Sequence, residues 1–119
     1  ALYVLFMLTL AMHDKAPKMF AIDSFDHALN PRLAKKVTEL FSKKIIEENK
    51  TVFMTTHNPL VLDGLDLSDD NIRLFTTDRN KNGLVEIRRV QVSEELIKMN
   101  QPLSRLWING LLGGVPELL

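Results

Sequence analysis

Two short apolar runs, each followed by a polar residue, are the clearest pattern in the chain. The first covers residues 18–23 and ends in Asp23, and the second covers residues 50–56 and is followed by His57. We expect both runs to be buried strands, and the first, which shows no alternation, to be covered on two faces as in a parallel sheet. Because α/β sheets bind ligands at the carboxyl ends of their strands, Asp23 and His57 are candidate site residues.

Between the two runs the pattern changes to that of an amphipathic helix. Asn30 and Pro31 form a typical helix start, with Asn as the cap and Pro at the first helical position. The apolar residues that recur at helical spacing are Leu33, Val37, Leu40, Phe41 and Ile45. Most of the basic residues lie off this stripe, which favours a solvated face over a binding patch. The order strand, helix, strand predicts a βαβ unit.

The other segments predict flanking helices and a hairpin. Residues 1–12 are apolar all round but cover only about half of the roughly 20 residues that span a membrane, so we expect a buried helix. Residues 72–76 and 84–90 flank Asn82-Gly83, a typical hairpin turn, and this hairpin is expected to extend the edge of the sheet. Shorter helices or turns are expected at residues 59–65, from Ser93 to Met99, from Pro102, and in the turn-rich end 110–116.

Composition limits the classes of function. Fifteen basic and fifteen acidic residues balance, so bulk charge indicates neither a nucleic-acid nor an anionic membrane surface, although local patches stay open. The absence of cysteine excludes disulfides, thiolate metal sites and cysteine nucleophiles, and is compatible with the cytoplasm. No GxxxxGK[ST] phosphate loop occurs in the 119 residues. At this length we expect one domain at most, and a piece of something longer.

Asp23 and His57 each have two interpretations from the residues alone. A carboxylate at the mouth of a buried strand can hold Mg²⁺ through a water, but Asp23 can equally cap the turn that follows it. A strand-end imidazole such as His57 can donate to a phosphate oxygen, or it can hydrogen-bond within its own loop beside two threonines. Their βαβ spacing would bring both residues to one edge of the sheet, which favours a site.

Three segments of the chain resemble those of ABC-type ATPases. Residues 20–31 (FAIDSFDHALNP) resemble the Walker B and D-loop segment, residues 54–59 (MTTHNP) resemble the switch or H-loop, and residues 103–114 (LSRLWINGLLGG) are similar to the carboxyl-terminal stretch. The branch is the compact one that includes SMC-like, RecF-like and OLD-like proteins and the AAA-type ATPases of bacterial defence systems such as Septu and some retrons.

This resemblance implies an α/β fold, the carboxyl-terminal half of a P-loop NTPase-like, mainly parallel sheet with flanking helices and an edge hairpin. The implied parts are the helix after the signature motif, Walker B with the D-loop, the H-loop, and the hairpin with terminal helices, at residues 1–15, 18–31, 51–59 and 71–119. The implied partners are the rest of the ATPase domain with its phosphate loop and signature motif, a second copy, and a nuclease or DNA, without a membrane.

The resemblance also implies roles for individual residues. The cofactors are ATP and Mg²⁺, with Asp23 in the Mg²⁺-associated Walker B role and His57 at the γ-phosphate. Ser24 and Asn58 adjoin these two residues and are further candidates for nucleotide contact. The D-loop, which crosses to the opposite site of the dimer, corresponds to Ala28, Leu29 and Asn30.

One departure concerns the catalytic base. The family usually has Glu directly after the Walker B Asp, whereas this chain has Ser24, whose hydroxyl cannot accept a proton comparably at neutral pH. Either Asp26 supplies the carboxylate, or hydrolysis is slow or regulated and the site works mainly as an ATP-gated clamp. We favour slow or tightly regulated hydrolysis, and the candidate catalytic residues are Asp26 and His57.

Two further functions compete with an ATPase. One is a non-catalytic interaction module that keeps the scaffold and docks a partner through the helix after Pro31 or through the hairpin. The other is a metal-dependent phosphotransfer or nuclease domain built on Asp23, Asp26 and Asp78, although their spacing gives no reason to expect Asp78 near the other two.

Overall fold

The structure, a computed structural model, describes residues 2–91 and 93–112. The chain divides into two compact units, residues 1–65 and residues 66–119, where its length led us to expect one domain. Among the residues described, no helix is both long enough and apolar enough to cross a membrane.

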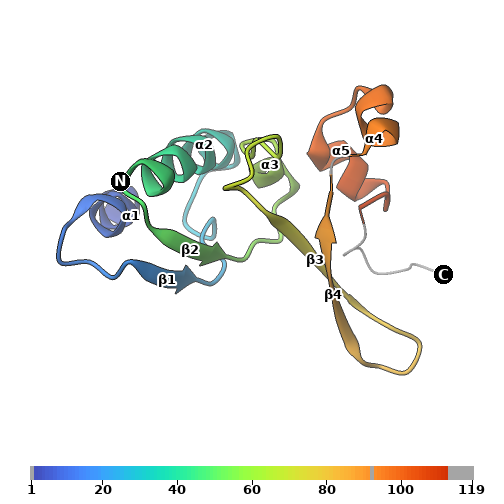
Figure 1. Ribbon diagram of the computed structural model, residues 1–119, viewed down its shortest axis with the longest axis horizontal. Helices are drawn as coiled ribbons and strands as arrows, with labels where there is room; N and C mark the ends of the chain where they lie inside the picture. Colours follow the sequence, from blue (N-terminus) through green and yellow to red (C-terminus); the bar gives the residue numbers. More distant parts are fainter. Residues whose placement is uncertain (1, 92, 113–119) are drawn as a thin grey trace. The chain divides into compact units, whose positions relative to one another are not determined.

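Two parallel strands joined by a helix form the centre of the first unit (Figure 1). β1 (Met19–Ile22) pairs in parallel with β2 (Thr51–Met54), in a register that runs from Met19 opposite Thr51 to Ile22 opposite Met54. The connection contains α2 (Pro31–Glu47). The predicted βαβ unit is therefore confirmed, with strands that are shorter at both ends than the apolar runs.

The start of α2 is the one that the sequence predicts. The side chain of Asn30 accepts a hydrogen bond from the backbone N–H of Arg32 over 2.9 Å, and Pro31 is the first helical residue. The predicted apolar stripe is only partly correct, because Leu33 and Leu40 are 53% and 50% exposed. The residues of α2 that are buried are Ala34, Thr38, Phe41 and Ile45.

A close approach between two backbones explains this shift of the buried face. α3 (Pro59–Leu62) ends beside α2, and a Cβ atom added to Gly64 would lie 2.5 Å from the carbonyl oxygen of Lys35 and 3.0 Å from Cβ of Thr38. Small residues are therefore required where the two segments meet, and the large Leu33 and Leu40 lie elsewhere on α2. The spacing of hydrophobic residues in the sequence does not reveal this requirement for small residues.

The elements of the first unit bury apolar residues on one side of the strands only. The strand residues that contact the core are Phe20, Ile22, Val52 and Met54, and the helices α1 and α2 lie on that side (Figure 1). On the other face Met19 is 64% and Phe53 is 61% exposed. The expectation that the first strand is covered on two faces is therefore wrong for the residues described.

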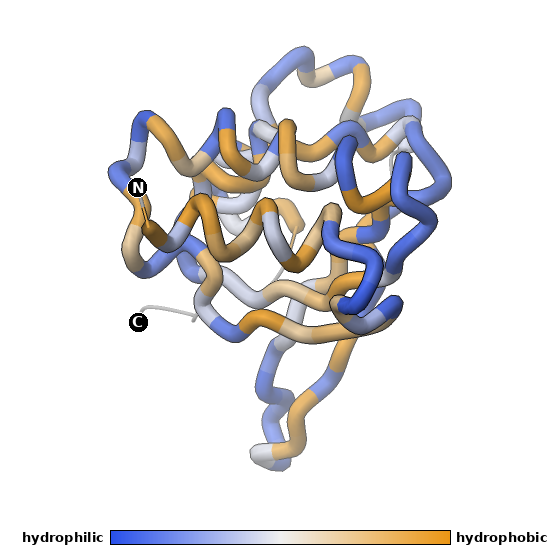
Figure 2. The backbone as a smooth tube through the Cα atoms, turned by 90° about the vertical axis from the view of Figure 1, so that its left-hand side faces the viewer, coloured by the Kyte–Doolittle hydropathy of each residue, from blue (hydrophilic) through white to orange (hydrophobic). Residues whose placement is uncertain are grey.

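α1 (Leu2–Met12) is likewise buried on one face only. Hydrophobic residues dominate its length (Figure 2), but only Met7 and Ala11 are buried, and Leu2, Leu5 and Phe6 are 81%, 60% and 54% exposed. The predicted helix exists, but the prediction that it is buried is correct for one face only. A helix that is apolar all round needs covering on all sides, and the described residues cover one.

A lysine side chain ties the end of α1 to the start of β2. Lys50 is 8% exposed, and its Nζ donates to the carbonyl oxygens of Leu10 and His13 over 2.8 and 3.0 Å. A cation at this position satisfies carbonyl groups that have no partner within the helix and also complements the helix dipole.

The second unit begins with the predicted hairpin. β3 (Leu74–Arg79) and β4 (Val85–Val90) pair antiparallel and form a two-stranded sheet of their own, which corrects the expectation that they extend the edge of the parallel sheet. In the turn, Gly83 has a φ of +80°, but the side chain of Asn80 accepts from the backbone N–H groups of Asn82 and Leu84. Asn80 therefore organises the turn that was assigned to Asn82-Gly83.

Two short helices follow the hairpin. They are α4 (Glu94–Met99), which begins after Ser93, and α5 (Leu103–Ile108), which begins after Pro102, and both starts agree with the prediction. Of the turn-rich end, Gly110 has a φ of +76°, and residues 113–116 lie outside the described part of the chain.

Candidate functional site

Asp23 lies directly beyond the last pair of the parallel ladder, where β2 continues into Thr55. The hydroxyl of Thr55 donates to Oδ1 of Asp23 and at the same time accepts from the backbone N–H of Ser24 over 2.7 Å. Backbone bonds continue the contact, from Thr55 N–H to the carbonyl of Ile22 and from Phe25 N–H to the carbonyl of Thr55, each at 3.2 Å. Thr55 therefore fixes an exposed carboxylate at this edge.

A second carboxylate is held in the same way by the next threonine. The hydroxyl of Thr56 donates to Oδ1 of Asp26 over 2.6 Å and accepts from the backbone N–H of Asn58 over 3.0 Å. Asp26 is half-buried, and its Oδ2 makes no hydrogen bond with the described residues. Two consecutive threonines on one loop thus hold Asp23 and Asp26 on the other.

A tight turn explains why both carboxylates meet the same loop. Ser24 has a φ of +48°, in the left-handed region that non-glycine residues seldom adopt. The side chain of Phe25 is 1% exposed and belongs to the core, so it anchors the turn. The N–H of His27 and its ring Nδ1 both contact the carbonyl oxygen of Ser24, at 3.0 and 2.8 Å. In a continued strand, Asp23 and Asp26 would have pointed to opposite faces.

His57 and Asn58 lie in the loop after Thr56, as predicted, but differ in what they contact. Asn58 caps α3, because its side-chain oxygen accepts from the backbone N–H of Leu60 over 3.0 Å. His57 is exposed, and its side chain makes no hydrogen bond with any residue that the structure describes. Its imidazole is therefore free to contact a ligand.

The three residues predicted as dimer contacts have different surroundings in the first unit. Leu29 packs against the core and Asn30 caps α2, so both have a role within the first unit. Ala28 is exposed.

Tyr3 on α1 is a neighbour of the site that the sequence did not suggest. Its ring meets the ring of His27 edge to face, with centroids 5.3 Å apart and an interplanar angle of 71°. The hydroxyl of Tyr3 is buried and has no hydrogen-bond partner among the residues that the structure describes. Burial raises the pKa of Tyr3 above its usual value, and the negative charge of Asp26 raises it further.

The candidate site offers few protein ligands for a metal ion. Within residues 2–91 and 93–112 no group of three or more His, Cys, Asp or Glu side chains is arranged to hold a metal ion. The alternative of a metal-dependent domain built on Asp23, Asp26 and Asp78 therefore has no such cluster of three among the described residues to support it. Mg²⁺, however, is commonly held by one or two carboxylates, waters and substrate phosphates. The exposed, fixed carboxylate of Asp23 fits that manner of binding.

Thr55 and Thr56 are the residues that sequence reasoning missed as positioning groups. The first contact follows from the register of the parallel strands, which continues from the pair Ile22 and Met54 to Asp23 and Thr55 and which only the structure shows. The second contact, from Thr56 to Asp26, depends on the turn at Ser24 and has no counterpart in the pattern of the sequence.

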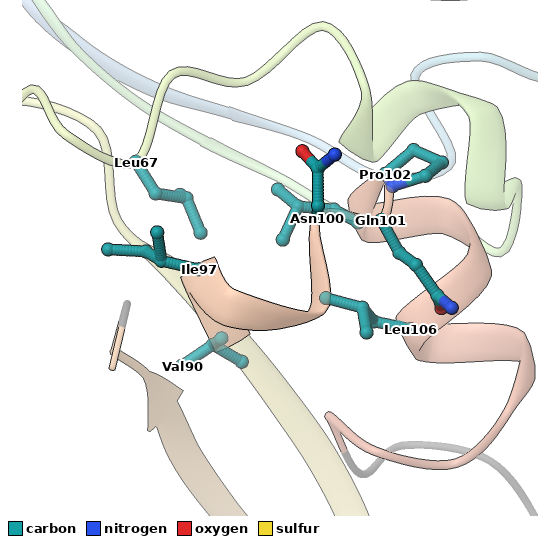
Figure 3. Close-up of a pocket in the computed structure, with 8 residues that line it drawn as sticks. Leu67, Val90, Ile97, Asn100, Gln101, Pro102 and Leu106 are labelled. Atoms are coloured by element: carbon teal, nitrogen blue, oxygen red, sulfur yellow. The ribbon is translucent and has the colours of Figure 1, made fainter. Parts of the chain in front are cut away.

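The second unit contains a hollow of about 410 Å³ between α4, α5 and the end of β4 (Figure 3). Apolar side chains and two amides line it, without a titratable group, so it offers no acid, base or metal ligand. The lining residues are Leu67, Val90, Ile97, Asn100, Gln101, Pro102, Leu103 and Leu106.

The chain was compared with known families, curated proteins and solved structures. The family described as "AAA domain, putative AbiEii toxin, Type IV TA system" matches residues 2–63, about half of the chain. The matched residues include β1, β2, the turn at Ser24 and both Thr55 and Thr56. No curated protein and no solved structure matches the chain.

Proposed function

Because the chain belongs to this family of AAA domains, whose function is nucleotide-binding and ATPase-like, we propose that it binds ATP and takes part in slow or regulated ATP hydrolysis. The finer proposal is that it is the carboxyl-terminal part of an ABC-type ATPase head. Such a head closes as a dimer around two nucleotides.

The pairing of two carboxylates with two consecutive threonines is the observation that carries this proposal. Asp23 and Asp26 are held by Thr55 and Thr56 at the carboxyl edge of parallel strands, where α/β folds bind nucleotides. Phosphoryl transfer depends on positioned groups more than on covalent chemistry, so fixed carboxylates are what such a site needs.

The proposed roles follow from the exposure and contacts of each side chain. Asp23 would hold Mg²⁺ through a water, and the ion, when bound, would neutralise charge on the phosphates. His57, which is exposed, would donate to the γ-phosphate. Asp26, with Oδ2 unengaged, would accept the proton of the attacking water in place of the usual Glu, whose position Ser24 occupies. Ser24 and Asn58 would line the nucleotide.

The wider assembly is proposed on the resemblance alone. The phosphate loop and the signature motif would come from outside these 119 residues, and Ala28, Leu29 and Asn30 would reach the opposite site of the dimer. We also propose that the assembly acts in the cytoplasm, in bacterial defence or DNA maintenance, with a nuclease or DNA as its partner. The uncovered apolar residues Met19 and Phe53 support the idea that further protein covers the strands.

The central experiment measures phosphate release by the intact gene product that carries this chain. We expect Asp23→Ala to weaken Mg²⁺-dependent nucleotide binding, and Asp26→Ala to abolish turnover while leaving nucleotide binding intact. Turnover that survives Asp26→Ala unchanged would rule out Asp26 as the base. A protein that neither binds nor hydrolyses ATP would overturn the function as a whole.

The alternative is an interaction module that keeps the ATPase scaffold without catalysis. The exposed apolar residues of its helices and hairpin favour it. Binding of a partner that persists without nucleotide, and in the Asp23→Ala variant, would support this alternative over the ATPase.

A further inference from the structure

One face of the β3–β4 hairpin is exposed along its whole length. In a two-stranded sheet alternate residues share a face, and the antiparallel register places Phe75 opposite Arg89, Thr77 opposite Ile87 and Arg79 opposite Val85. All six side chains are exposed, and we call these six residues the outer face. In Figure 2 the hairpin changes repeatedly between hydrophobic and hydrophilic colours along its strands.

The outer face combines large apolar side chains with positive charge. Phe75, Val85 and Ile87 are 51%, 61% and 67% exposed. Arg79 and Arg89 lie beside them, and neither forms a hydrogen bond or ion pair with any residue that the structure describes. The outer face therefore carries two unpaired guanidinium groups and no carboxylate.

The carboxylates of the hairpin are on its other face. Asp78 and Glu86 lie opposite one another there. The guanidinium of Arg88 contacts Glu86 over 3.0 Å, and hydrogen bonds from Asn80 and Arg88, with the charge of Arg88, lower the pKa of Glu86. The two faces thus differ in sign, although the whole chain is balanced in charge.

We propose that the outer face is a docking surface for an acidic protein segment that also carries apolar side chains. Apolar contact area with arginine and aromatic anchors is typical of protein interfaces, and arginine pairs with carboxylates in a bidentate manner. A two-stranded sheet with an uncovered apolar face is also marginal by itself, so a partner on this face would stabilise the hairpin.

Two other occupants fit less well. Single-stranded nucleic acid binds through aromatic platforms on which bases stack, and the outer face has one aromatic ring beside two aliphatic β-branched residues. A second copy of the same face would bring Arg79 and Arg89 close to the arginines of the other copy, and like charges across an interface are unfavourable.

The test begins with a selection on the full 119-residue chain. Random peptides displayed on phage are selected for binding, and the affinity of the enriched peptides is then measured by fluorescence anisotropy. We expect the enriched sequences to contain more Asp, Glu and apolar residues than the unselected library. Selection of sequences without an acidic excess, or of none, would overturn the proposal.

Two neighbouring arginines supply a matched control. Arg89→Gln and Arg88→Gln remove the same charge from adjacent positions, but only Arg89 is on the outer face. We expect Arg89→Gln to weaken peptide binding about fivefold, as for an exposed ion pair, and Arg88→Gln to change it less than twofold. Ile87→Thr should also weaken peptide binding, and the size of this loss should depend little on salt concentration. Equal losses in the two arginine variants would contradict the proposal.

The same variants distinguish the other occupants. A labelled single-stranded oligonucleotide that binds the wild type, and loses affinity with Arg89→Gln but not Arg88→Gln, would show that the face takes nucleic acid instead. Concentration-dependent self-association with that pattern, measured by sedimentation, would show a second copy. Either outcome would overturn docking of an acidic protein segment.

Discussion

Thr56 donates its hydroxyl hydrogen to Asp26 over 2.6 Å and thereby links the loop after β2 to the turn after β1. The two residues are 30 positions apart, and the contact depends both on the parallel register of the strands and on the turn at Ser24. It holds one oxygen of a half-buried carboxylate and leaves the other available.

Removing this hydroxyl should slow ATP hydrolysis by the intact protein. We expect Thr56→Val to lower kcat by about 10- to 100-fold, because a base that is no longer held in place loses its alignment with the attacking water. Nucleotide affinity should change little. Steady-state phosphate release and equilibrium binding of an ATP analogue measure the two effects. Thr56→Ser keeps the hydroxyl and should retain activity, and equal rates for the Val and Ser variants would contradict the role of Thr56.

The ionisation of Tyr3 reports on Asp26 directly. The chain has one tyrosine, so the ultraviolet absorbance of tyrosinate follows Tyr3 alone. Burial is the larger cause of its raised pKa and Asp26 the smaller. Asp26→Asn should therefore lower the pKa of Tyr3 without restoring the usual value of about 10. An Asp26→Asn variant with an unchanged titration would show that the two groups do not interact.

The same raised pKa makes stability depend on pH in the alkaline range. Above about pH 10 an unfolded chain loses the phenol proton more readily than the folded one, so folding stability is complete below that pH and falls as pH rises further. Tyr3→Phe should remove this part of the decline. The variant also removes a buried hydroxyl that has no hydrogen-bond partner among the described residues. Its free energy of unfolding at neutral pH should therefore be higher by about 1 kcal/mol. Urea denaturation of both proteins across this pH range is the measurement.

Lys50 should be important for the stability of the first unit. Lys50→Met keeps most of the apolar stem but removes the Nζ donor to the carbonyl oxygens of Leu10 and His13, of which His13 keeps the backbone N–H of Ala16 as a donor. Hydrogen bonds to a charged group contribute about 1.5–3 kcal/mol, and we expect a loss of this size in urea denaturation. Lys43→Met, on the exposed surface of α2, should change stability by less than about 0.5 kcal/mol.

Gly64 should tolerate no side chain. The added Cβ atom of Gly64→Ala would lie 2.5 Å from the backbone oxygen of Lys35, which cannot move without shifting α2. We expect a loss of about 1–3 kcal/mol or more, as for other overpacked sites. Gly83→Ala meets no atom within 4 Å but has a φ of +80°, so its cost should be only the backbone strain of about 1–2 kcal/mol. Thermal unfolding of the two variants is the measurement. A larger loss of stability in Gly83→Ala than in Gly64→Ala would contradict this account of Gly64.

Local signals in the sequence predicted most elements and several of their ends. Asn30 with Pro31 started α2, and Ser93 and Pro102 preceded the two terminal helices, because caps and proline act on the backbone next to them. The family match over residues 2–63 agrees with the ATPase-like resemblance.

Hydrophobicity alone predicted burial less well. Leu33 and Leu40 were expected in the core and are half-exposed, whereas Ala34 and Thr38 are buried, because steric space beside Gly64 selects small residues. The first strand was predicted to be covered on both faces, but coverage depends on what packs against a strand, and the described residues cover one face.

The sequence by itself therefore determined the order of the elements, the parallel βαβ unit and the positions of Asp23 and His57 at its carboxyl edge, since these depend on local backbone preferences and on the direction of the chain. Only the tertiary structure decided that Thr55 and Thr56 hold the two carboxylates, that Tyr3 lies beside His27, and that the arginines and carboxylates of the hairpin separate onto opposite faces. These contacts depend on strand register and on the turn at Ser24, and a change of one residue in either would rearrange them.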